Sequence, residues 1–252
     1  MPIDPVCRQE VDLRTAHSTK IVDGRAFYFC CAECAEAYLT HPELAAGAEL
    51  PMRLTVGVMG SAGDDETQHA RDIAYALGKA IADRGFILIT GACHGLPYDA
   101  ARGARSAGGQ SVGVSPALSL HEHLYRYRSP ADAFDVLIYT GSGLMGREVT
   151  NIRSSDMVVV LGGRSGTLGE FAIAYDEGKL IGVMQGTGGI ADDIRQIVNS
   201  FDKETGAVLL YDSDPVDLVA RLSETFENTH FRKPSVFSDA VSGTAEQTEE
   251  PA

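Results

Sequence analysis

Apolar and polar positions form alternating blocks between residues 53 and 229, and these blocks predict a parallel sheet with helices between its strands. Short continuous apolar runs, typical of strands covered on both faces, occur at Leu54–Met59, Phe86–Thr90, Ser111–Val114, Val136–Tyr139, Met157–Leu161, Leu180–Met184 and Val208–Tyr211. Amphipathic stretches predict helices at Glu66–Arg84, Tyr98–Ala107, Gly146–Ser154, Leu168–Glu177, Ile190–Ser200 and Pro215–Glu227. Asp214 is a favourable N-cap for the last helix, and proline suits the position that Pro215 takes. The alternation indicates an α/β fold with helices on both faces of the sheet.

The segments on either side of this block have different patterns. Residues 1–47 end in a short helical stretch over Ala32–Leu39, and residues 48–52 resemble a linker, so a small separate module is expected at the N-terminus. From residue 231 onward the chain is rich in Pro, Ser, Gly, Thr and Glu and has few apolar residues. This composition predicts a disordered tail over residues 231–252.

The charge of the chain narrows the range of partners. Net charge is −14 over 252 residues. A nucleic-acid backbone or an anionic membrane as the main partner would require a basic face, whereas a small phosphate requires only local donors. No apolar run approaches the roughly 20 residues of a membrane helix, and the first residues lack the pattern of a secretory signal. We therefore expect a cytoplasmic protein that binds a small molecule.

Four of the five cysteines lie within the first 34 residues, which points to chemistry in the N-terminal module. Two thiolates four positions apart, Cys30 and Cys34, together with the distant Cys7, have a spacing suited to one thiophilic metal ion such as zinc or copper(I). The alternative is that these cysteines are small core residues. Three thiolates leave a tetrahedral site incomplete, and the fourth ligand stays open among Cys31, His17, His41 and water.

A family resemblance supports the metal prediction for the module. It rests on Asp4-Pro5-Val6-Cys7, Gly24, Phe27-Tyr28-Phe29-Cys30-Cys31-Ala32-Glu33-Cys34, Tyr38 and Pro42. This segment resembles the YHS domain, a member of the TRASH-like metal-binding modules. The resemblance implies a metal-handling or metal-sensing appendage and not a catalytic centre.

Three glycine-containing loops follow predicted strands, where ligands bind in parallel sheets. The first contains Gly60 and Ser61, and the second contains Gly91 and Gly95. Glycines let a ligand approach the backbone, and the helix that follows offers free amides to a phosphate. For the first loop the alternative is that Asp64 and Asp65 cap the next helix. His94 in the second loop is most simply a solvated side chain.

The third loop carries the strongest pattern for anion binding. It runs from the end of a strand into a helix and contains Gly162, Gly163, Ser165, Gly166 and Thr167. Three glycines and two hydroxyls at a helix start predict an anion cradle. Thr167 with Glu170, three residues later, also fits a capping box without any function. That alternative does not explain the preceding glycines.

Arg147 is placed near the same edge of the sheet, close to the start of a predicted helix. A cation is disfavoured at a helix N-terminus unless an anion lies nearby, because the helix dipole is positive there. The position therefore favours a role in anion binding. A solvated surface arginine is the alternative.

The segment Gly162–Glu170 resembles the PGGxGTxxE signature of the Lonely Guy (LOG) family, whose members were once described as lysine decarboxylases. Arg147 falls where that family has the arginine of its M-x-x-R-K segment. The resemblance covers residues 53 to 228 and implies a Rossmann-like fold, a homodimer, and release of a base and ribose 5-phosphate from a nucleoside 5′-monophosphate. Arg147 and Glu170 would then be the catalytic pair, with Gly163, Gly166 and Thr167 on the phosphate.

Four positions depart from the LOG pattern. They are Gly162 for its proline, Arg164 for its second glycine, Gly169 for its first glutamate and Glu148 for its lysine. In these respects the chain resembles a neighbouring branch that includes molybdenum-cofactor carrier proteins. Two functions stay open: a cofactor-independent hydrolase of N-glycosidic bonds, or a carrier that binds a nucleotide or the molybdenum cofactor without turnover.

Overall fold

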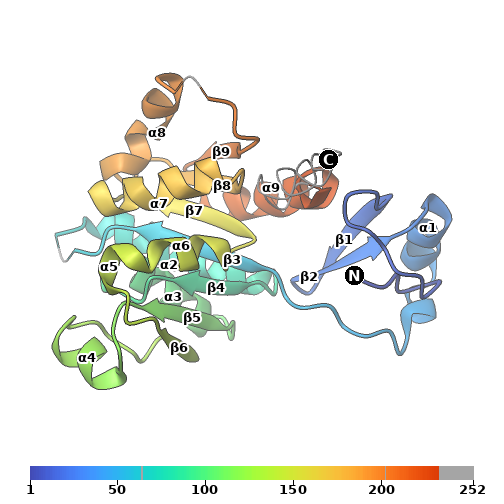
Figure 1. The fold of residues 1–252 in the computed structure, drawn as a ribbon, viewed down its shortest axis with the longest axis horizontal. Coiled ribbons are helices and arrows are strands. Elements are labelled where there is room, and N and C mark those ends of the chain that lie inside the picture. Colours follow the sequence, from blue (N-terminus) through green and yellow to red (C-terminus); the bar gives the residue numbers. More distant parts are fainter. Residues whose placement is uncertain (64, 202, 233–252) are drawn as a thin grey trace, which may run out of the picture.

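The computed structural model describes residues 1–63, 65–201 and 203–232 and has a seven-stranded parallel sheet at its centre. The strand order is β6-β5-β4-β3-β7-β8-β9 (Figure 1). The strands are β3 (Thr55–Gly60), β4 (Ile87–Thr90), β5 (Ser111–Ser115), β6 (Val136–Tyr139), β7 (Met157–Leu161), β8 (Leu180–Met184) and β9 (Val208–Asp212). All seven predicted strands are present and no end is displaced by more than one residue, so the α/β fold is confirmed.

Helices cover both faces of this sheet. One face packs against α2 (Gln68–Asp83), α3 (Leu96–Ser106) and α9 (Pro215–Asn228), and the other packs against α6 (Glu148–Arg153), α7 (Ser165–Asp176) and α8 (Gly189–Asn199). Successive residues of β7 alternate between the two cores: Val159 belongs to the first, and Val158 and Val160 belong to the second. Because both faces are covered, β7 is a continuous apolar run with no polar positions.

Two of the predicted helices differ clearly from the structure, and one short helix was not predicted. The predicted helix over Gly146–Ser154 is two short helices, α5 (Gly143–Gly146) and α6, with Arg147 between them. The helix predicted to begin at Leu168 begins at Ser165. The short helix α4 (Leu120–Tyr125) has no counterpart among the predicted elements, because its 6 residues are too few to show a helical period.

N-terminal caps were predicted or considered for two helices, α9 and α2. The Asp214 carboxylate accepts the amides of Val216 at 2.8 Å and Asp217 at 3.1 Å, so the predicted cap of α9 is confirmed. At α2 the N-cap is Thr67 and not Asp65, because the Thr67 hydroxyl accepts the Ala70 amide. Asp64, also considered as a cap, lies outside the described residues.

The N-terminal module consists of a β-hairpin and a helix. Strands β1 (Ser18–Val22) and β2 (Arg25–Phe29) pair antiparallel, and α1 (Ala32–Thr40) and a single 3-10 turn, η1 (Pro42–Ala45), follow. Neither strand is among the predicted elements. Figure 1 shows the module beyond the amino ends of the main sheet.

The module is packed against the main domain. Its Val11, Ala16 and Ala26 join the same hydrophobic core as Leu54 and Phe86. The Leu54 amide donates to the Gly24 carbonyl at 2.7 Å, and a Cβ atom on Gly24 would overlap the Gly85 backbone. This close approach requires a glycine at position 24 and fixes the hairpin turn against the sheet.

The C-terminal end of the main domain also contacts the module. A short turn, η2 (His230–Arg232), follows α9, and the Phe231 ring lies 6.1 Å from that of Tyr28 in β2. Phe231 is buried, so the first residue of the predicted tail belongs to the folded part. Residues 233–252 of that tail lie outside the described residues. Among the helices of the described part, none has the length and hydropathy needed to cross a membrane.

Candidate functional site

A cavity of about 300 Å³ opens at the carboxyl ends of β3, β4 and β7. This edge is where ligands bind in open parallel sheets, and the volume is within the range of small-molecule sites, roughly 300–1,000 Å³. Its walls are the loops after those three strands, the segment from α5 to α6, and the first turn of α7. The sequence-predicted residues that line it are Gly60, Ser61, Arg147, Ser165, Gly166, Thr167 and Glu170.

Arg147 and Glu170 meet inside this cavity. Each is only 7% exposed, and Arg147 Nη1 lies 3.8 Å from Glu170 Oε1. Arg147 Nη2 donates to the Sγ atom of Cys93 at 3.3 Å. Gly91 makes room for this arrangement, because a Cβ atom there would overlap the guanidinium. Gly91 therefore positions the arginine, which its sequence pattern alone does not indicate.

Burial and the nearby charged side chains determine the pKa of Glu170. The pKa of Glu170 is raised to about 7, mainly by burial; Arg147 lowers it, the nearby Glu148 carboxylate raises it, and a hydrogen bond with Asn151 lowers it. The Nε and Nη1 atoms of Arg147 are buried and have no hydrogen-bond acceptor among the described residues. Buried donors of this kind are normally paired, so the geometry leaves room for an anionic or hydrogen-bonding ligand beside the arginine.

The first turn of α7 supplies backbone donors to the cavity. The N-cap residue is Arg164, which makes no side-chain hydrogen bond to the helix. The first amides of a helix have no acceptor within it, and Ser165, Gly166 and Thr167 line the cavity. Thr167 is the third residue of the helix and not its N-cap, so the capping-box alternative is wrong.

The amides of the two glycines before α7 form hydrogen bonds within the protein and do not face the cavity. The Gly162 amide donates to Thr187 Oγ1 at 2.8 Å, and the Gly163 amide donates to Ser61 Oγ at 2.6 Å. Both glycines have a positive φ, 55° and 100°. Their amides are therefore used to hold the loop together, which leaves the first turn of α7 as the part of the loop that faces a ligand.

The remaining predicted loop residues hold two loops together. Gly95 is the N-cap of α3, has φ 89°, and packs so closely on Ser61 that a Cβ atom would overlap the Ser61 carbonyl. The Leu96 amide donates to that same carbonyl at 3.0 Å. This contact fixes the loop that carries Gly60 and Ser61 beside the cavity. His94, next in the chain to Cys93, is half-buried.

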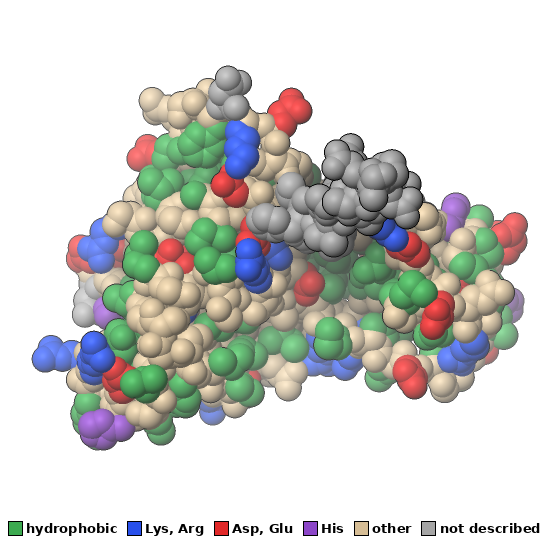
Figure 2. Space-filling model, viewed as in Figure 1, with side chains coloured by type: hydrophobic (Ala, Val, Ile, Leu, Met, Phe, Trp, Pro, Cys, Tyr) green, Lys and Arg blue, Asp and Glu red, His purple; other side chains and the backbone are tan. Residues whose placement is uncertain are grey.

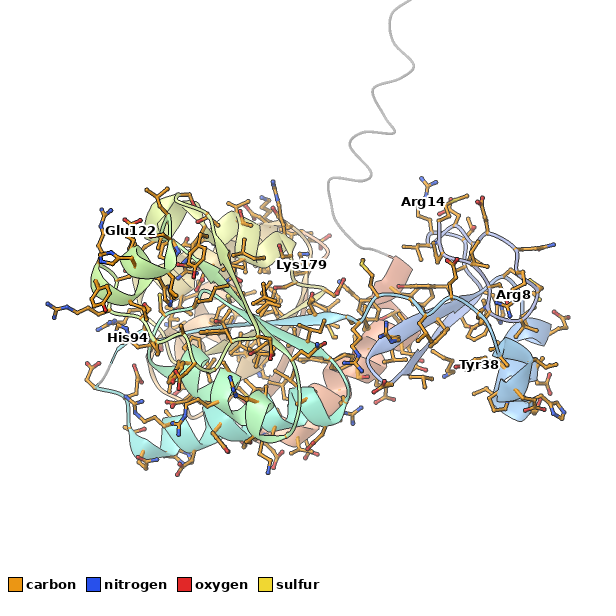
Figure 3. The ribbon with its side chains drawn as sticks, turned by 90° about the horizontal axis from the view of Figure 1, so that it is seen from below. Arg8, Arg14, Tyr38, His94, Glu122 and Lys179 are labelled. Atoms are coloured by element: carbon orange, nitrogen blue, oxygen red, sulfur yellow. The ribbon has the colours of Figure 1, made fainter. Side chains whose placement is uncertain are left out.

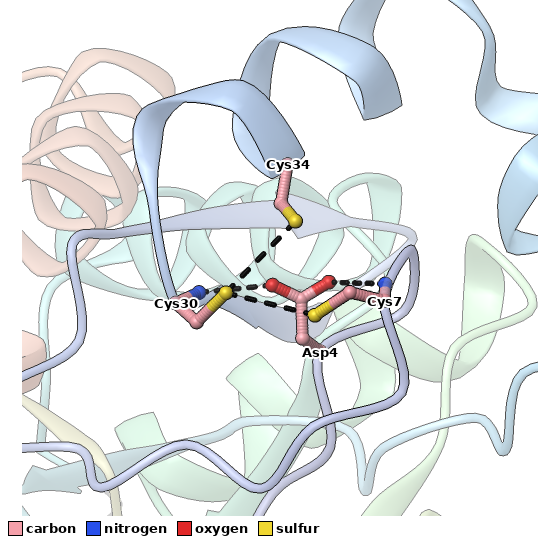
Figure 4. Close-up of side chains that lie close together, drawn as sticks. All are labelled: Asp4, Cys7, Cys30 and Cys34. Atoms are coloured by element: carbon pink, nitrogen blue, oxygen red, sulfur yellow. Dashed lines mark hydrogen bonds between the residues drawn. The ribbon is translucent and has the colours of Figure 1, made fainter.

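The module holds a second candidate site, made of the predicted cysteines. Cys7 Sγ lies 3.6 Å from Cys30 Sγ, which lies 3.9 Å from Cys34 Sγ (Figure 4). Thiolates at about 2.3 Å from a zinc ion in a tetrahedron are about 3.8 Å apart. The sulfur spacing therefore fits a tetrahedral metal, and the cluster is a possible metal site. Burial raises the pKa of Cys30 to about 12, so a metal would displace protons on binding.

The fourth member of this cluster is Asp4, which the sequence analysis did not include. One ligand atom from each of Asp4, Cys7, Cys30 and Cys34 lies within 4.8 Å of the others. The Asp4 carboxylate also accepts the backbone amides of Cys7 at 3.2 Å and Cys30 at 2.9 Å. None of the three side chains suggested as a fourth ligand belongs to the cluster among the described residues: Cys31, His17 and His41.

The two sites lie at opposite ends of the molecule. His94 follows Cys93 of the cavity, and Tyr38 belongs to α1 of the module. Figure 3 shows His94 and Tyr38 at opposite ends of the side-chain view. The sheet lies between the cavity and the cysteine cluster.

Residues 53–219 match the model of the SLOG cluster4 family. The chain belongs to the SLOG cluster4 family. The match runs from β3 into α9 and includes the whole cavity, while the N-terminal module lies outside it.

Among the relatives of this SLOG cluster4 protein are two proteins with similar sequences and one with a similar structure. An uncharacterized protein of Archaeoglobus fulgidus is 36% identical over 129 residues, 51% of this chain and 78% of that protein. A cytokinin riboside 5′-monophosphate phosphoribohydrolase of Mycobacterium marinum is 33% identical over 138 residues, 54% of this chain and 70% of that protein. The molybdenum cofactor carrier protein of Chlamydomonas reinhardtii has a similar structure, with 30% identity and a TM-score of 0.56 over 69% of this chain and 98% of that one. The resemblance to the LOG superfamily is thereby confirmed, and the YHS resemblance stays a prediction.

Proposed function

We propose that the cavity binds a nucleoside 5′-monophosphate and that the protein hydrolyses its N-glycosidic bond, releasing the base and ribose 5-phosphate. The observation that carries this proposal is the buried pair of Arg147 and Glu170 beside the uncapped first turn of α7. The phosphate would accept hydrogen bonds from the amides of that turn, which also carries the positive end of the helix dipole. The name of the Mycobacterium marinum relative supports the reaction class.

The reaction adds water across the C1′–N bond, and each residue has a separate part. As the bond to the base breaks, positive charge develops on the ribose, and the Glu170 carboxylate stabilises it. Glu170 takes a proton from the attacking water and passes it to the departing nitrogen, so that water is added across the bond and the carboxylate is restored. A carboxyl with a pKa of about 7 suits both transfers at neutral pH. Arg147 positions and stabilises the nucleotide through the positive charge of its guanidinium.

A carrier without turnover is the second candidate. It is favoured by the match to the molybdenum cofactor carrier protein, which extends over 98% of that chain. In this case the same helix start would hold a pterin phosphate. Arg147 and Glu170 would then serve binding only.

One assay separates the two candidates. The purified protein is incubated with AMP and other nucleoside monophosphates, and free base is measured by chromatography. Hydrolysis predicts base release that Glu170→Ala reduces by a factor of about 100 or more. A matched control is Glu224→Gln, an exposed glutamate on α9. Tight binding without base release, unchanged in Glu170→Ala, would instead establish the carrier.

We propose that the N-terminal module binds one thiophilic ion, zinc or copper(I), through Cys7, Cys30 and Cys34. The sulfur spacing supports a tetrahedral site. Such an ion would hold the loop of Cys7 against α1 and report on metal supply. Elemental analysis of the wild-type protein is expected to find close to one equivalent of metal, and Cys30→Ser is expected to lose it. Cys93→Ser is the matched control, since Cys93 lies in the cavity.

We further propose that two copies associate through the β6 edge of the sheet. Apolar side chains are exposed on β6, on α4 and the loop just before it, and on α5, at Leu118, Leu120, Leu124, Tyr125, Val136, Ile138, Leu144 and Met145. Figure 2 shows hydrophobic side chains over this corner of the molecule. Contiguous apolar patches and unpaired strand edges are typical of interfaces, and Leu144 and Met145 also line the cavity.

A further inference from the structure

Glu148 is a second acidic side chain in the cavity, and its role goes beyond the proposed pair. It is the first residue of α6, lines the cavity, and is 6% exposed. Within the described residues, no hydrogen bond or ion pair is found for its carboxylate. The adjacent Arg147 does not neutralise it through an ion pair, because that guanidinium reaches Cys93 and Glu170.

The position of the carboxylate is set by two glycines of α7. A Cβ atom on Gly169 would lie 3.2 Å from Glu148 Oε2, and one on Gly166 would lie 3.9 Å from Oε1. A larger side chain at position 169 would crowd the carboxylate. Glu148 therefore rests on the α6 side of α7, within the cavity that Arg147 and Glu170 share.

The Glu148 carboxylate has no donor from the described part of the protein, and its oxygens are not among the fully buried unpartnered atoms of the described residues, so they face the open space of the cavity. Burial raises the pKa of Glu148, which reflects the loss of hydration. Such groups are normally satisfied by a hydrogen bond. A ligand that displaces water from the cavity would therefore have to supply a hydrogen-bond donor to this carboxylate.

We propose that Glu148 accepts a hydrogen bond from an exocyclic amino group on the base of the bound nucleotide, and that the cavity thereby selects bases that carry such a group. The inference rests on the proposed nucleotide site and adds its substrate class. The ligand would have an anionic end at the first turn of α7 and a hydrogen-bond donor at Glu148. A carboxylate acceptor would disfavour a base that presents only acceptors there.

The test compares two nucleotides that differ in one amino group. Binding of AMP and of purine riboside 5′-monophosphate, which lacks the amino group, is measured by calorimetry in a Glu170→Ala background that prevents turnover. A charge-assisted hydrogen bond predicts that AMP binds about tenfold or more tightly. Glu148→Met is expected to abolish this preference, and Glu148→Gln to reduce it.

Two controls make the outcomes distinct. Ribose 5-phosphate should bind Glu148→Met at least as well as it binds the parent protein, which verifies that the phosphate site is intact. Glu224→Gln should keep the AMP preference. Equal binding of AMP and purine riboside 5′-monophosphate to the parent protein would overturn the inference and leave the nucleotide site standing. Failure of all three ligands to bind would overturn the nucleotide site itself, and the inference with it.

Discussion

At the residue scale, the chemistry of the cavity depends on how little water reaches Glu170. An exposed glutamate has a pKa near 4.5, whereas burial raises that of Glu170 to about 7. Arg147 offsets part of this rise in the pKa of Glu170. Two nitrogen atoms of its guanidinium group, Nε and Nη1, have no hydrogen-bond acceptor among the described residues. The site therefore holds a carboxyl that changes charge close to neutral pH.

This shift makes stability depend on pH. Because the folded pKa of Glu170 is higher than the unfolded pKa, the protein loses stability as pH rises from about 4.5 through about 7. Glu170→Gln does not ionise, so its free energy of unfolding relative to wild type should improve by about 3 kcal/mol between these limits. Urea denaturation at a series of pH values measures the difference. Parallel pH curves for the two proteins would contradict the assigned protonation.

A second residue-scale prediction concerns Gly91. A methyl group at this position would overlap the Arg147 guanidinium, so Gly91→Ala should displace it. We expect a loss in nucleotide affinity or base release of roughly 100-fold. Because both changes act on one side chain, Gly91→Ala with Arg147→Ala should be no worse than Arg147→Ala alone. Additive losses in the double variant would show that Gly91 acts independently.

At the scale of elements, the helices differ in whether a side chain accepts their first amides, and α3, α7 and α8 have no such cap. Helix α9 begins with an aspartate that accepts two amides, and α2 begins with a threonine cap. Helix α7 begins without a side-chain cap, at the cavity. Its free amides are the donors available to a phosphate.

The cap of α9 provides a test of stability. Asp214→Ala removes the acceptor of two amides and should lower the free energy of unfolding by about 1 kcal/mol, or the melting temperature by roughly 2–4 °C. The measurement is thermal denaturation followed by circular dichroism. Asp193→Ala, at an exposed position within α8, serves as the control and should have little effect. Equal stability of wild type and Asp214→Ala would rule out this cap in solution.

The strands could be predicted because burial on both faces leaves an unmistakable apolar run, as in β7. The start of α7 could not, because Thr167 and Glu170 satisfy a local capping pattern that the glycines before them override. The module hairpin was missed because β1 contains Ser18, Thr19 and Lys20 and so lacks a clear apolar pattern.

For the site, the residue types were more predictable than their partners. Arg147 and Glu170 were found from local motifs, and their contact depends on α6 and α7 packing together. The roles of Asp4 and Glu148 come from contacts between distant segments: Asp4 reaches the Cys30 amide, and Glu148 rests on Gly169. No spacing within one segment indicates such contacts.

At the scale of the whole molecule, the exposed edge of the sheet predicts self-association. Ile138 on β6 is 47% exposed in the apolar patch, so Ile138→Lys should place a charge in the proposed interface and convert a dimer into a monomer. Light scattering coupled to gel filtration measures the mass. Val216 on α9 is 58% exposed and lies outside the patch, so Val216→Lys should leave the mass unchanged. A monomeric wild-type protein would refute the interface.

The placement of the cysteine cluster beyond the amino ends of the strands limits how the two halves can cooperate. An ion held at Cys30 is separated from the cavity by the length of the sheet (Figure 1). Transfer of that ion to the cavity of the same chain would require the hairpin to break the close contact between Gly24 and the Gly85 backbone. If the hairpin stays in place, an ion could pass from the cysteine cluster to a cavity only between two separate molecules. A signal within one chain has a physical route along α9, because that helix contacts both β1 and β8.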